Sequence, residues 1–216
     1  MKNIQYILFF CLVISCTNDL NTFSACDSPE FISCCDGGEF SVLTFNRSEL
    51  TSLNSALRVI QEANPDIVGL QESYGVGLDI ATSLGYCYYG YEDSSIAFLS
   101  KFEMDFINDN YIRIYLNDKT VINFFNVHFN SDLYQPYQIR DGGLTTVWEI
   151  EHEAEEIRRE EFQALLGDLQ PLIKDEKIIL VGDFNEPSHL DWNSEAENLG
   201  LNFGFEVKWP ISNNLQ

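Results

Sequence analysis

The chain has 216 residues, of which 45% are hydrophobic, and its formal net charge is −22 at pH 7. This length predicts one domain, alone or with a tail, and the composition is ordinary for a globular protein with a sizeable core. The strong acidity argues against tight, phosphate-driven binding to duplex nucleic acid, which needs clustered Lys and Arg. An acidic enzyme that first binds a divalent cation remains compatible with this charge.

Residues 1–15 are predicted to be a signal peptide that does not belong to the fold. Lys2 supplies a thin positive start, and the apolar run 4–14 is too short to span a bilayer. The run ends in Leu-Val-Ile-Ser-Cys at 12–16, which resembles a bacterial lipobox with Cys16 as the site of lipid attachment. We therefore expect an exported lipoprotein of the bacterial cell envelope, anchored to a membrane on its periplasmic or cell-surface side. An ordinary secretory signal with a coincidental cysteine is the alternative.

Residues 16–39 are polar and are expected to form a tether to a domain at 40–216. Outside the cytoplasm the thiols of this tether can be oxidised. Cys26 could pair with Cys34 or Cys35, which would leave one neighbour and Cys87 over, and the spacing does not decide the connectivity. A zinc site is the weaker interpretation, because no histidine lies nearby.

Predicted strands and helices alternate after the tether. A helix is expected to begin after Ser48 as its N-cap and to end at Asn64, before Pro65. Segment 130–146 is predicted to be a long functional loop. Strands are predicted at Glu39–Asn46, Ile67–Gln71, 86–91, 95–99, 111–115, 121–127 and 178–181, and further helices at 78–84 and Val147–Leu169.

The most informative stretch is the apolar strand 178–181 with the turn that follows it. Gly182 permits a sharp turn and Pro187 prevents the strand from continuing. Asp183 and Asn185 are therefore predicted at the carboxyl end of a buried strand, where open α/β sheets bind their ligands. The carboxylate can accept a proton or orient a water, and the amide can bind a phosphate or a metal. A simple Asx turn is the structural alternative.

Three other predicted strands also end in polar side chains, namely Asn46, Glu72 and His128. Carboxylate and amide oxygens are hard ligands that suit Mg²⁺, with Mn²⁺ or Ca²⁺ as alternatives, rather than zinc. With a histidine to stabilise the developing charge and Asp183 to hold a water, the set describes metal-assisted phosphoester hydrolysis. Each residue alone would more often be a solvated strand end, a turn residue or a structural histidine. Their joint occurrence at strand ends favours the functional interpretation.

Together these segments resemble the endonuclease/exonuclease/phosphatase superfamily, which has the DNase I-like fold. The resemblance implies an α/β fold, a four-layer sandwich of two mixed β-sheets flanked by helices, with the site between the sheets. The matching segments are Val-Leu-Thr-Phe-Asn at 42–46, Pro-Asp-Ile-Val-Gly-Leu-Gln-Glu at 65–72, Ser-Ile-Ala-Phe-Leu-Ser-Lys at 95–101, Asn-Val-His-Phe at 126–129 and Val-Gly-Asp-Phe-Asn at 181–185.

The resemblance also implies a role for each candidate residue. Asn46 and Glu72 would hold the metal, and Asp183 would orient the attacking water. Asn185 would bind phosphate near the metal, and His128 would stabilise the transition state. The histidine favours the deoxyribonuclease, sphingomyelinase and phosphatase branches, because the exonuclease III and abasic-site branch carries a tyrosine there.

Segments 182–192 and 208–210 further resemble a bacterial secreted subgroup of this superfamily. The superfamily pattern closes with an acidic residue on a late strand and a terminal Asp-His pair, which these 216 residues do not contain. His152 and His189 lie elsewhere and do not fit that pair. The sequence therefore resembles a C-terminally truncated member with an incomplete second sheet, expected to be weakly active or inactive.

The expected function is hydrolysis of a phosphoester by a monomer, with a small molecule, a lipid head group or nucleic acid as substrate. A secreted endonuclease is the alternative among enzymes, and the acidity disfavours it. A non-catalytic surface binding protein that keeps the fold is the alternative of another class, favoured by the absent Asp-His pair.

Overall fold

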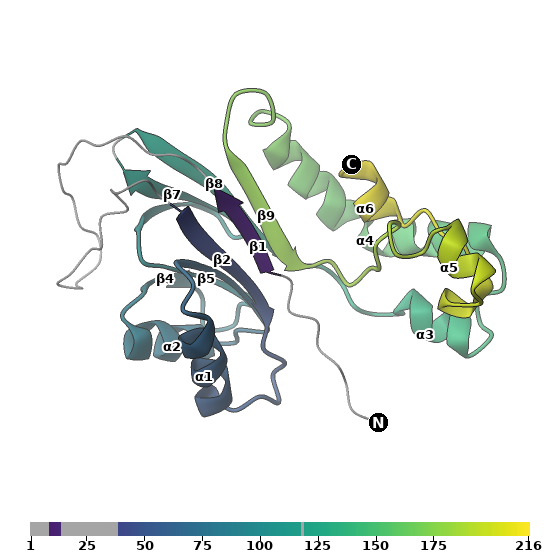
Figure 1. The fold of residues 1–216 in the computed structure, drawn as a ribbon, viewed down its shortest axis with the longest axis horizontal. Helices are drawn as coiled ribbons and strands as arrows, with labels where there is room; N and C mark the ends of the chain where they lie inside the picture. Colours follow the sequence, from purple (N-terminus) through teal and green to yellow (C-terminus); the bar gives the residue numbers. More distant parts are fainter. Residues whose placement is uncertain (1–8, 14–38, 118) are drawn as a thin grey trace. The chain divides into compact units, whose positions relative to one another are not determined.

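A computed structural model describes residues 9–13, 39–117 and 119–216 (Figure 1). The chain divides into two compact units, and each is described by itself. The sheet unit is Met1–His128 with Leu172–Gly182, and the helical unit is Phe129–Pro171 with Asp183–Gln216. The predicted lipid site and tether cysteines (Cys16, Cys26, Cys34 and Cys35) lie outside the described residues.

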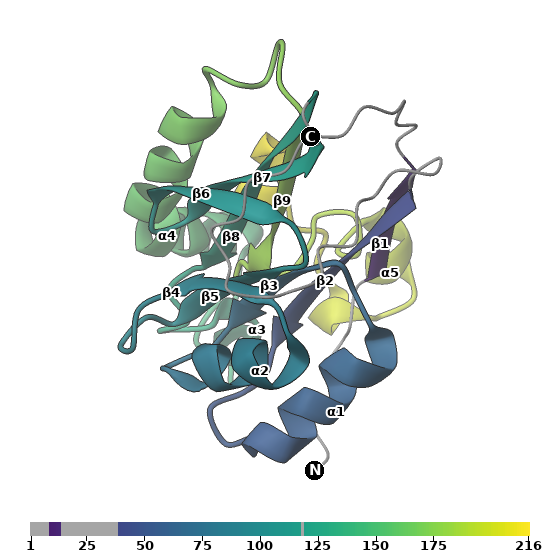
Figure 2. The same ribbon diagram turned by 90° about the vertical axis from the view of Figure 1, so that its left-hand side faces the viewer.

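Two mixed β-sheets face each other in the sheet unit (Figure 2). The strand order is β1-β2-β3-β5-β4 in the first sheet and β6-β7-β8-β9 in the second. In the first sheet β2 and β3 are parallel and the other pairs antiparallel, and β6, β7 and β8 form an antiparallel meander. The predicted sandwich of two mixed sheets is confirmed. The strands are β1 (Phe9–Val13), β2 (Glu39–Asn46), β3 (Ile67–Gln71), β4 (Cys87–Gly90), β5 (Ile96–Ser100), β6 (Glu103–Asn108), β7 (Tyr111–Asn117), β8 (Thr120–His128) and β9 (Ile178–Asp183).

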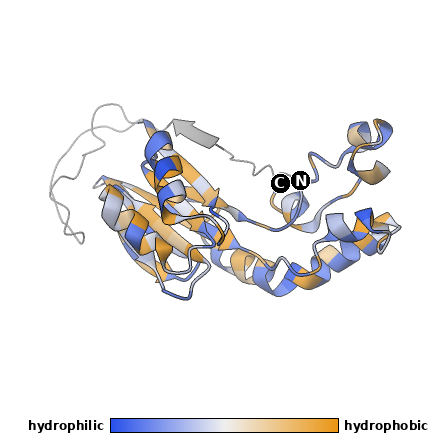
Figure 3. Ribbon diagram, turned by 90° about the horizontal axis from the view of Figure 1, so that it is seen from below, coloured by the Kyte–Doolittle hydropathy of each residue, from blue (hydrophilic) through white to orange (hydrophobic). Residues whose placement is uncertain are grey.

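The core between the two sheets is built from the facing side chains of β2, β3, β5, β7, β8 and β9. Phe98 on β5 meets Phe124 on β8 edge to face, with ring centroids 6.1 Å apart. A Cβ at Gly69 would lie 2.5 Å from Val181 Cγ2, so a glycine is needed where β3 and β9 approach. Hydropathy colouring shows the strands of this unit as predominantly hydrophobic (Figure 3). Cys87, at the start of β4, is buried and disulfide-bonded, a state that the spacing of the cysteines had left open.

Helices α1 (Leu53–Ala63) and α2 (Val76–Leu84) cover the outer face of the first sheet (Figure 2). Helix α1 begins after Ser52, whose Oγ accepts a hydrogen bond from Ser55 N, so the prediction of Ser48 as N-cap is wrong. Ser48 lies in the loop after β2 with a φ of 54°. Asn64 ends the helix in the left-handed conformation, as the Asn-Pro pair predicted.

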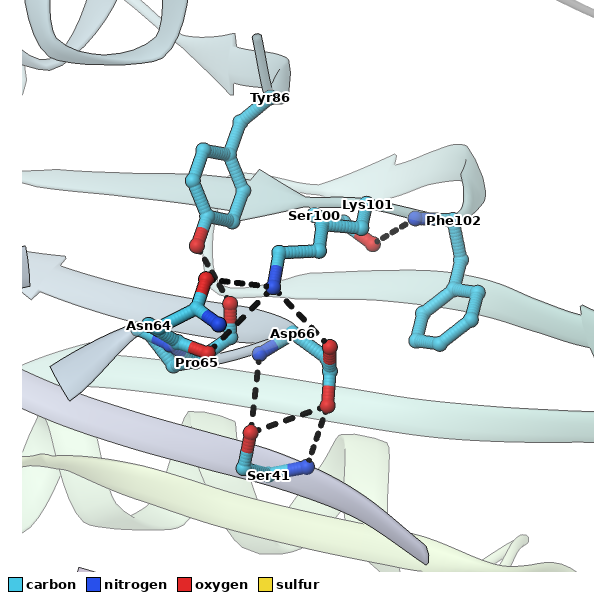
Figure 4. A network of polar contacts seen from close by, with 8 residues as sticks. All are labelled: Ser41, Asn64, Pro65, Asp66, Tyr86, Ser100, Lys101 and Phe102. Atoms are coloured by element: carbon cyan, nitrogen blue, oxygen red, sulfur yellow. Dashed lines mark hydrogen bonds and ion pairs between the residues drawn. The ribbon is translucent and has the colours of Figure 1, made fainter. Parts of the chain in front are cut away.

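A polar network joins the amino end of β3 to its neighbours (Figure 4). The Asp66 carboxylate accepts hydrogen bonds from Ser41 N and Oγ at 2.8 and 2.9 Å and pairs with Lys101 Nζ at 3.2 Å. Lys101 Nζ also donates to Asn64 Oδ1, and the Tyr86 hydroxyl donates to the Pro65 carbonyl. These residues therefore fix the end of the sheet opposite to the candidate site.

Strand β1 adds to the edge of the first sheet. Its residues pair antiparallel with β2, with Phe9 opposite Leu43 and Val13 opposite Glu39. The expectation that residues 1–15 are a signal peptide stays a prediction. An apolar segment can extend an open sheet edge through main-chain hydrogen bonds alone. Cleavage before Cys16 would remove this strand from the mature protein.

The helical unit contains α3 (Gln135–Arg140), α4 (Val147–Leu169), α5 (Ser194–Asn198), a 3₁₀ turn η1 (Asn202–Gly204) and α6 (Pro210–Asn214). Helix α4 has the predicted bounds and begins with a capping box between Thr146 and Glu149. The core of the helical unit includes Trp192 and Trp209, whose rings meet edge to face with their centroids 5.0 Å apart. The predicted loop 130–146 contains α3. No helix in the described part of the chain is long and apolar enough to cross a membrane.

Candidate functional site

Asn46 and Glu72 follow neighbouring parallel strands, and their loops meet. Asn46 lies opposite Gln71 in the β2–β3 register, so the two strands end at the same edge of the sheet. Asn46 Oδ1 accepts a hydrogen bond from Ser48 N at 2.9 Å, and Glu72 Oε2 accepts one from Glu49 N at 2.6 Å. The predicted pair of metal ligands is therefore brought together by hydrogen bonds to a single loop.

Backbone strain accompanies this part of the site. Glu72, Ser48 and Tyr74 have φ values of 55°, 54° and 40°. Left-handed conformations cost non-glycine residues about 1–2 kcal/mol each and gather at functional sites. The loops after β2 and β3 therefore need support from the residues around them.

Arg47 supplies that support, and the sequence analysis did not identify it. Its side chain is only 3% exposed. Nη1 donates to the carbonyls of Ser48 and Thr51 at 3.2 and 3.1 Å, and Nη2 donates to the carbonyl of Ser73 at 3.3 Å. One buried guanidinium thus ties together the loops that carry Asn46 and Glu72.

His128 ends β8 at the same end of the sheet unit as Glu72. Asn126 Nδ2 donates to the carbonyls of Leu70 and Ala97, and Gln71 Nε2 donates to Asn126 Oδ1 at 2.6 Å. These bonds place Asn126 beside the carboxyl end of β3, and the ring contact places Phe124 beside Phe98, farther from that end. Strand β8 therefore runs in the same direction as β3. His128, two residues beyond Asn126, is half-buried at the carboxyl end.

The helical unit carries the other two candidates, Asp183 and Asn185. Asn185 N donates to Asp183 Oδ1 at 2.9 Å, which is the Asx turn named as the structural alternative. Phe129 N donates to the Asp183 carbonyl at 2.9 Å, and Asn185 Nδ2 donates to the Phe129 carbonyl at 2.8 Å. Asn185 is held with a φ of 48°. The turn therefore also fixes the direction in which both side chains are presented.

Helix α4 holds the segment beside this turn. Arg158 Nε donates to the Asn130 carbonyl at 3.1 Å, and Arg158 Nη1 donates to Gln135 Oε1 at 2.9 Å. Asn130 N donates to Glu161 Oε2 at 2.9 Å. Arg158 was not among the residues predicted from the sequence. The available signal was its place on the buried stripe of the helix, four residues after Ala154 and eight after Ile150.

Two ionisable side chains near the turn have shifted pKa values. Burial raises the pKa of Glu186 to about 7, while hydrogen bonds from the Ile211 and Ser212 backbone and the charge of Arg158 lower it. Burial, and next the charge of Asp183, raise the pKa of Tyr134. The Tyr134 hydroxyl therefore stays protonated and able to donate near Asp183.

The donor set can be compared with the needs of a metal. Within residues 39–117 and 119–216, no group of three or more His, Cys, Asp or Glu side chains could hold a metal ion. Mg²⁺ usually keeps several waters and binds one or two carboxylates together with substrate phosphate. One carboxylate and one amide oxygen, from Glu72 and Asn46, therefore fit a water-rich Mg²⁺ site better than a closed cage.

The sheet unit thus brings Asn46, Glu72 and His128 to one end, and the helical unit brings Asp183 and Asn185 into one turn. Convergence of all five on one cleft stays a prediction.

Comparisons with known proteins found similar sequences and structures. The uncharacterized protein F14F9.5 of Caenorhabditis elegans is 25% identical over 171 residues, which cover 71% of this chain and 53% of that protein. Truncated Caenorhabditis elegans TDP2 has a TM-score of 0.50 at 16% identity, covering 68% of this chain and 62% of that one. An AP endonuclease from Archaeoglobus fulgidus has a TM-score of 0.48 at 17% identity, with coverages of 80% and 68%.

The chain spans about half the length of the curated relative it matches. The likeness to truncated Caenorhabditis elegans TDP2, at 16% identity, shows the fold alone. The model of the Endonuclease/Exonuclease/phosphatase family matches residues 38–214, which is most of the chain. The protein therefore belongs to the Endonuclease/Exonuclease/phosphatase family.

Proposed function

We propose that this chain carries a metal-dependent site for phosphoester hydrolysis. The observation that carries the proposal is the joined pair of loops that presents Asn46 and Glu72 at the end of the sheet unit where His128 lies. Hard oxygen donors beside a histidine suit a divalent cation bound to a phosphate.

Each residue has a distinct task in this proposal. Asn46 and Glu72 would hold Mg²⁺, which when bound would polarise the phosphoryl group as a Lewis acid. Asp183 accepts a proton from the attacking water, and its orientation is set by the hydrogen bond from Asn185 N.

Asn185 and His128 serve the phosphate. Asn185 Nδ2 gives one of its two hydrogens to the Phe129 carbonyl, which leaves the other to bind a phosphoryl oxygen. His128 donates to the oxygen on which negative charge develops.

The metal requirement can be tested on the 216-residue chain with bis(p-nitrophenyl) phosphate, a lipid phosphodiester and DNA. We expect slow turnover that needs Mg²⁺ and stops with EDTA, because a single carboxylate is a thin ligand shell. Glu72→Gln should abolish turnover and weaken Mn²⁺ binding measured by calorimetry, whereas the exposed neighbour Glu49→Gln should change neither. Turnover that survives EDTA would contradict the proposal.

The net charge of −22 supports a small or lipid phosphoester rather than duplex DNA as substrate. Turnover of DNA faster than of both other substrates would support the endonuclease alternative instead. The single carboxylate at the proposed metal site favours one second candidate, a non-catalytic surface protein. Mn²⁺ binding without turnover of any substrate would support that candidate.

We further propose export and lipid attachment at Cys16, supported by the apolar run that ends in Ser15-Cys16. Cys16→Ala should release the protein from membranes or block its maturation. Metabolic labelling with a fatty acid, followed by membrane fractionation, measures both effects. Unchanged processing and membrane association would contradict the anchor.

A further inference from the structure

We propose that Arg158 is a positioning residue for Asp183 and Asn185, acting through the backbone of Phe129 and Asn130. This inference rests on the proposed function for its catalytic consequence. The physical link itself consists of hydrogen bonds inside the helical unit.

The first step is the burial of a cation. Arg158 is 1% exposed and lies on the stripe of α4 formed with Ile150 and Ala154, whereas the adjacent Arg159 has a side chain that is 47% exposed. Burying a charge is unfavourable unless it is hydrogen-bonded, so a guanidinium on the apolar stripe needs fixed acceptors. The sequence places two arginines side by side, and the fold buries only one of them.

The second step is the grip on Asn130. Arg158 Nε donates to its carbonyl at 3.1 Å, while Glu161, one turn later on α4, accepts from its N–H at 2.9 Å. Both backbone groups of Asn130 are therefore held by charged side chains of one helix. Arg158 Nη1 extends the grip to Gln135 Oε1 at 2.9 Å, and Gln135 is itself fully buried. Segment 130–135, which leads into α3, is thus fixed at both of its ends.

The third step is transmission to the turn. Phe129 precedes Asn130, so clamping Asn130 also restricts the peptide that follows Phe129. Phe129 N and O are the groups that bond to the Asp183 carbonyl and to Asn185 Nδ2, at 2.9 and 2.8 Å. Asn130 is therefore hydrogen-bonded to α4, and its neighbour Phe129 is hydrogen-bonded to the turn that carries Asp183 and Asn185.

Electrostatics gives a second link between Arg158 and the turn. Among the described residues, Arg158 Nη2 and Glu186 Oε2 are buried without a hydrogen-bond partner. Glu186 directly follows Asn185, and its Oε1 accepts from Ile211 N at 2.7 Å. The carboxylates of Glu186 and Asp183 both act on the Arg158 guanidinium by charge. Loss of this cation would leave both carboxylates without a compensating charge from α4.

The test compares Arg158→Met, Arg158→Lys and the control Arg159→Met in the full chain. The first readout is hydrogen–deuterium exchange, and we expect Arg158→Met to speed exchange at 129–135 and 183–186 more than in α4 itself. The second readout is turnover of bis(p-nitrophenyl) phosphate. We expect kcat to fall about 10- to 100-fold with KM within about twofold, because misplacing a reacting group lowers the rate more than binding. Lys should restore part of the loss, and Arg159→Met should change neither readout.

The outcomes separate this inference from the proposed function. Faster exchange confined to the two segments supports the positioning role even if the wild-type chain turns over no substrate, a result that would count against the proposed function only. Uniformly faster exchange, or an Arg159→Met effect equal to that of Arg158→Met, would overturn the inference. If Arg158→Met does not fold, Glu161→Gln with its exposed neighbour Glu160→Gln repeats the comparison on the other half of the grip.

Discussion

The side-chain amide of Asn185 donates a hydrogen bond to the carbonyl oxygen of Phe129 at 2.8 Å. This bond joins the turn after β9 to the residue that follows β8, although the two residues are far apart in the sequence. Asn185 adopts a φ of 48° to make it, a conformation that asparagine tolerates better than most residues. One residue type therefore meets a backbone requirement, a tertiary hydrogen bond and a proposed phosphate contact.

Replacing Asn185 should separate these contributions. Asn185→Ala loses the hydrogen bond, worth about 1 kcal/mol, and adds left-handed strain of about 1–2 kcal/mol. Asn185→Gly loses the bond but relieves the strain, so it should be the more stable of the two in urea unfolding. Both variants should lose activity alike if the amide binds phosphate. Equal stabilities would show that the conformation of residue 185 relaxes after the change.

The strands and the longest helix could be predicted because their signals are local. The bounds of β2, β3 and α4 agree with the predicted ranges, since apolar runs and a capping box mark where they begin and end. Strand β6 (Glu103–Asn108) was missed, because none of its residues is buried and its pairing with β7 is a tertiary feature. Helix α3 was missed because its segment contains Pro136 and two glycines, which are typical of a loop.

The candidate site could be predicted only as residues at strand ends. Asn46 and Glu72 were placed there correctly, because each follows an apolar run that ends in a polar residue. Arg47 and Arg158 were not identified, because a single arginine next to a loop or in a charged helix is normally solvated. Their function follows from which backbone carbonyls the fold brings to them, and no local pattern specifies those acceptors.

Arg47 should matter for stability and for the metal site together. Arg47→Met removes hydrogen bonds to four loop carbonyls, and charged hydrogen bonds contribute about 1.5–3 kcal/mol each before relaxation. We expect a loss of more than about 2 kcal/mol in urea unfolding and weaker Mn²⁺ binding in calorimetry. Arg58→Met, on the exposed face of α1 with a side chain 74% exposed, is the control and should change both by little. Unaltered metal binding in a folded Arg47→Met would contradict its role in holding Glu72.

Glu186 should make stability depend on pH. Burial raises the pKa of its carboxyl from 4.5 to about 7, so the folded chain binds this proton more tightly than the unfolded chain. Its contribution to stability is then fully present below about pH 4.5 and is lost as the pH rises through about 7. Glutamine is neutral at every pH, so Glu186→Gln does not lose this contribution. The melting temperature of the variant minus that of wild type should therefore increase between pH 4.5 and pH 8.

The control for this pH effect is Glu206→Gln, because Glu206 is exposed in the same unit. Its melting temperature should differ from wild type by a constant amount across the range. A Glu186→Gln difference that also stays constant would mean that this carboxyl ionises normally in the folded protein.

Gly182 should be intolerant of any side chain. Its φ is 145°, and a Cβ there would lie 2.2 Å from the Val127 carbonyl oxygen and 2.7 Å from Val127 Cγ2. Overpacking costs about 1–3 kcal/mol and a disallowed backbone conformation adds to it, so Gly182→Ala should lose about 3 kcal/mol or more. The matched control is Gly167→Ala in α4, where a Cβ meets nothing within 4 Å and alanine should stabilise the helix by about 0.5–1 kcal/mol.

The two substitutions are chemically identical, so opposite signs in urea unfolding would isolate the contact between β9 and β8. A Gly182→Ala variant as stable as wild type would show that β9 can move away from β8 at this point. The turn that carries Asp183 would then be less rigid than its hydrogen bonds to Phe129 indicate.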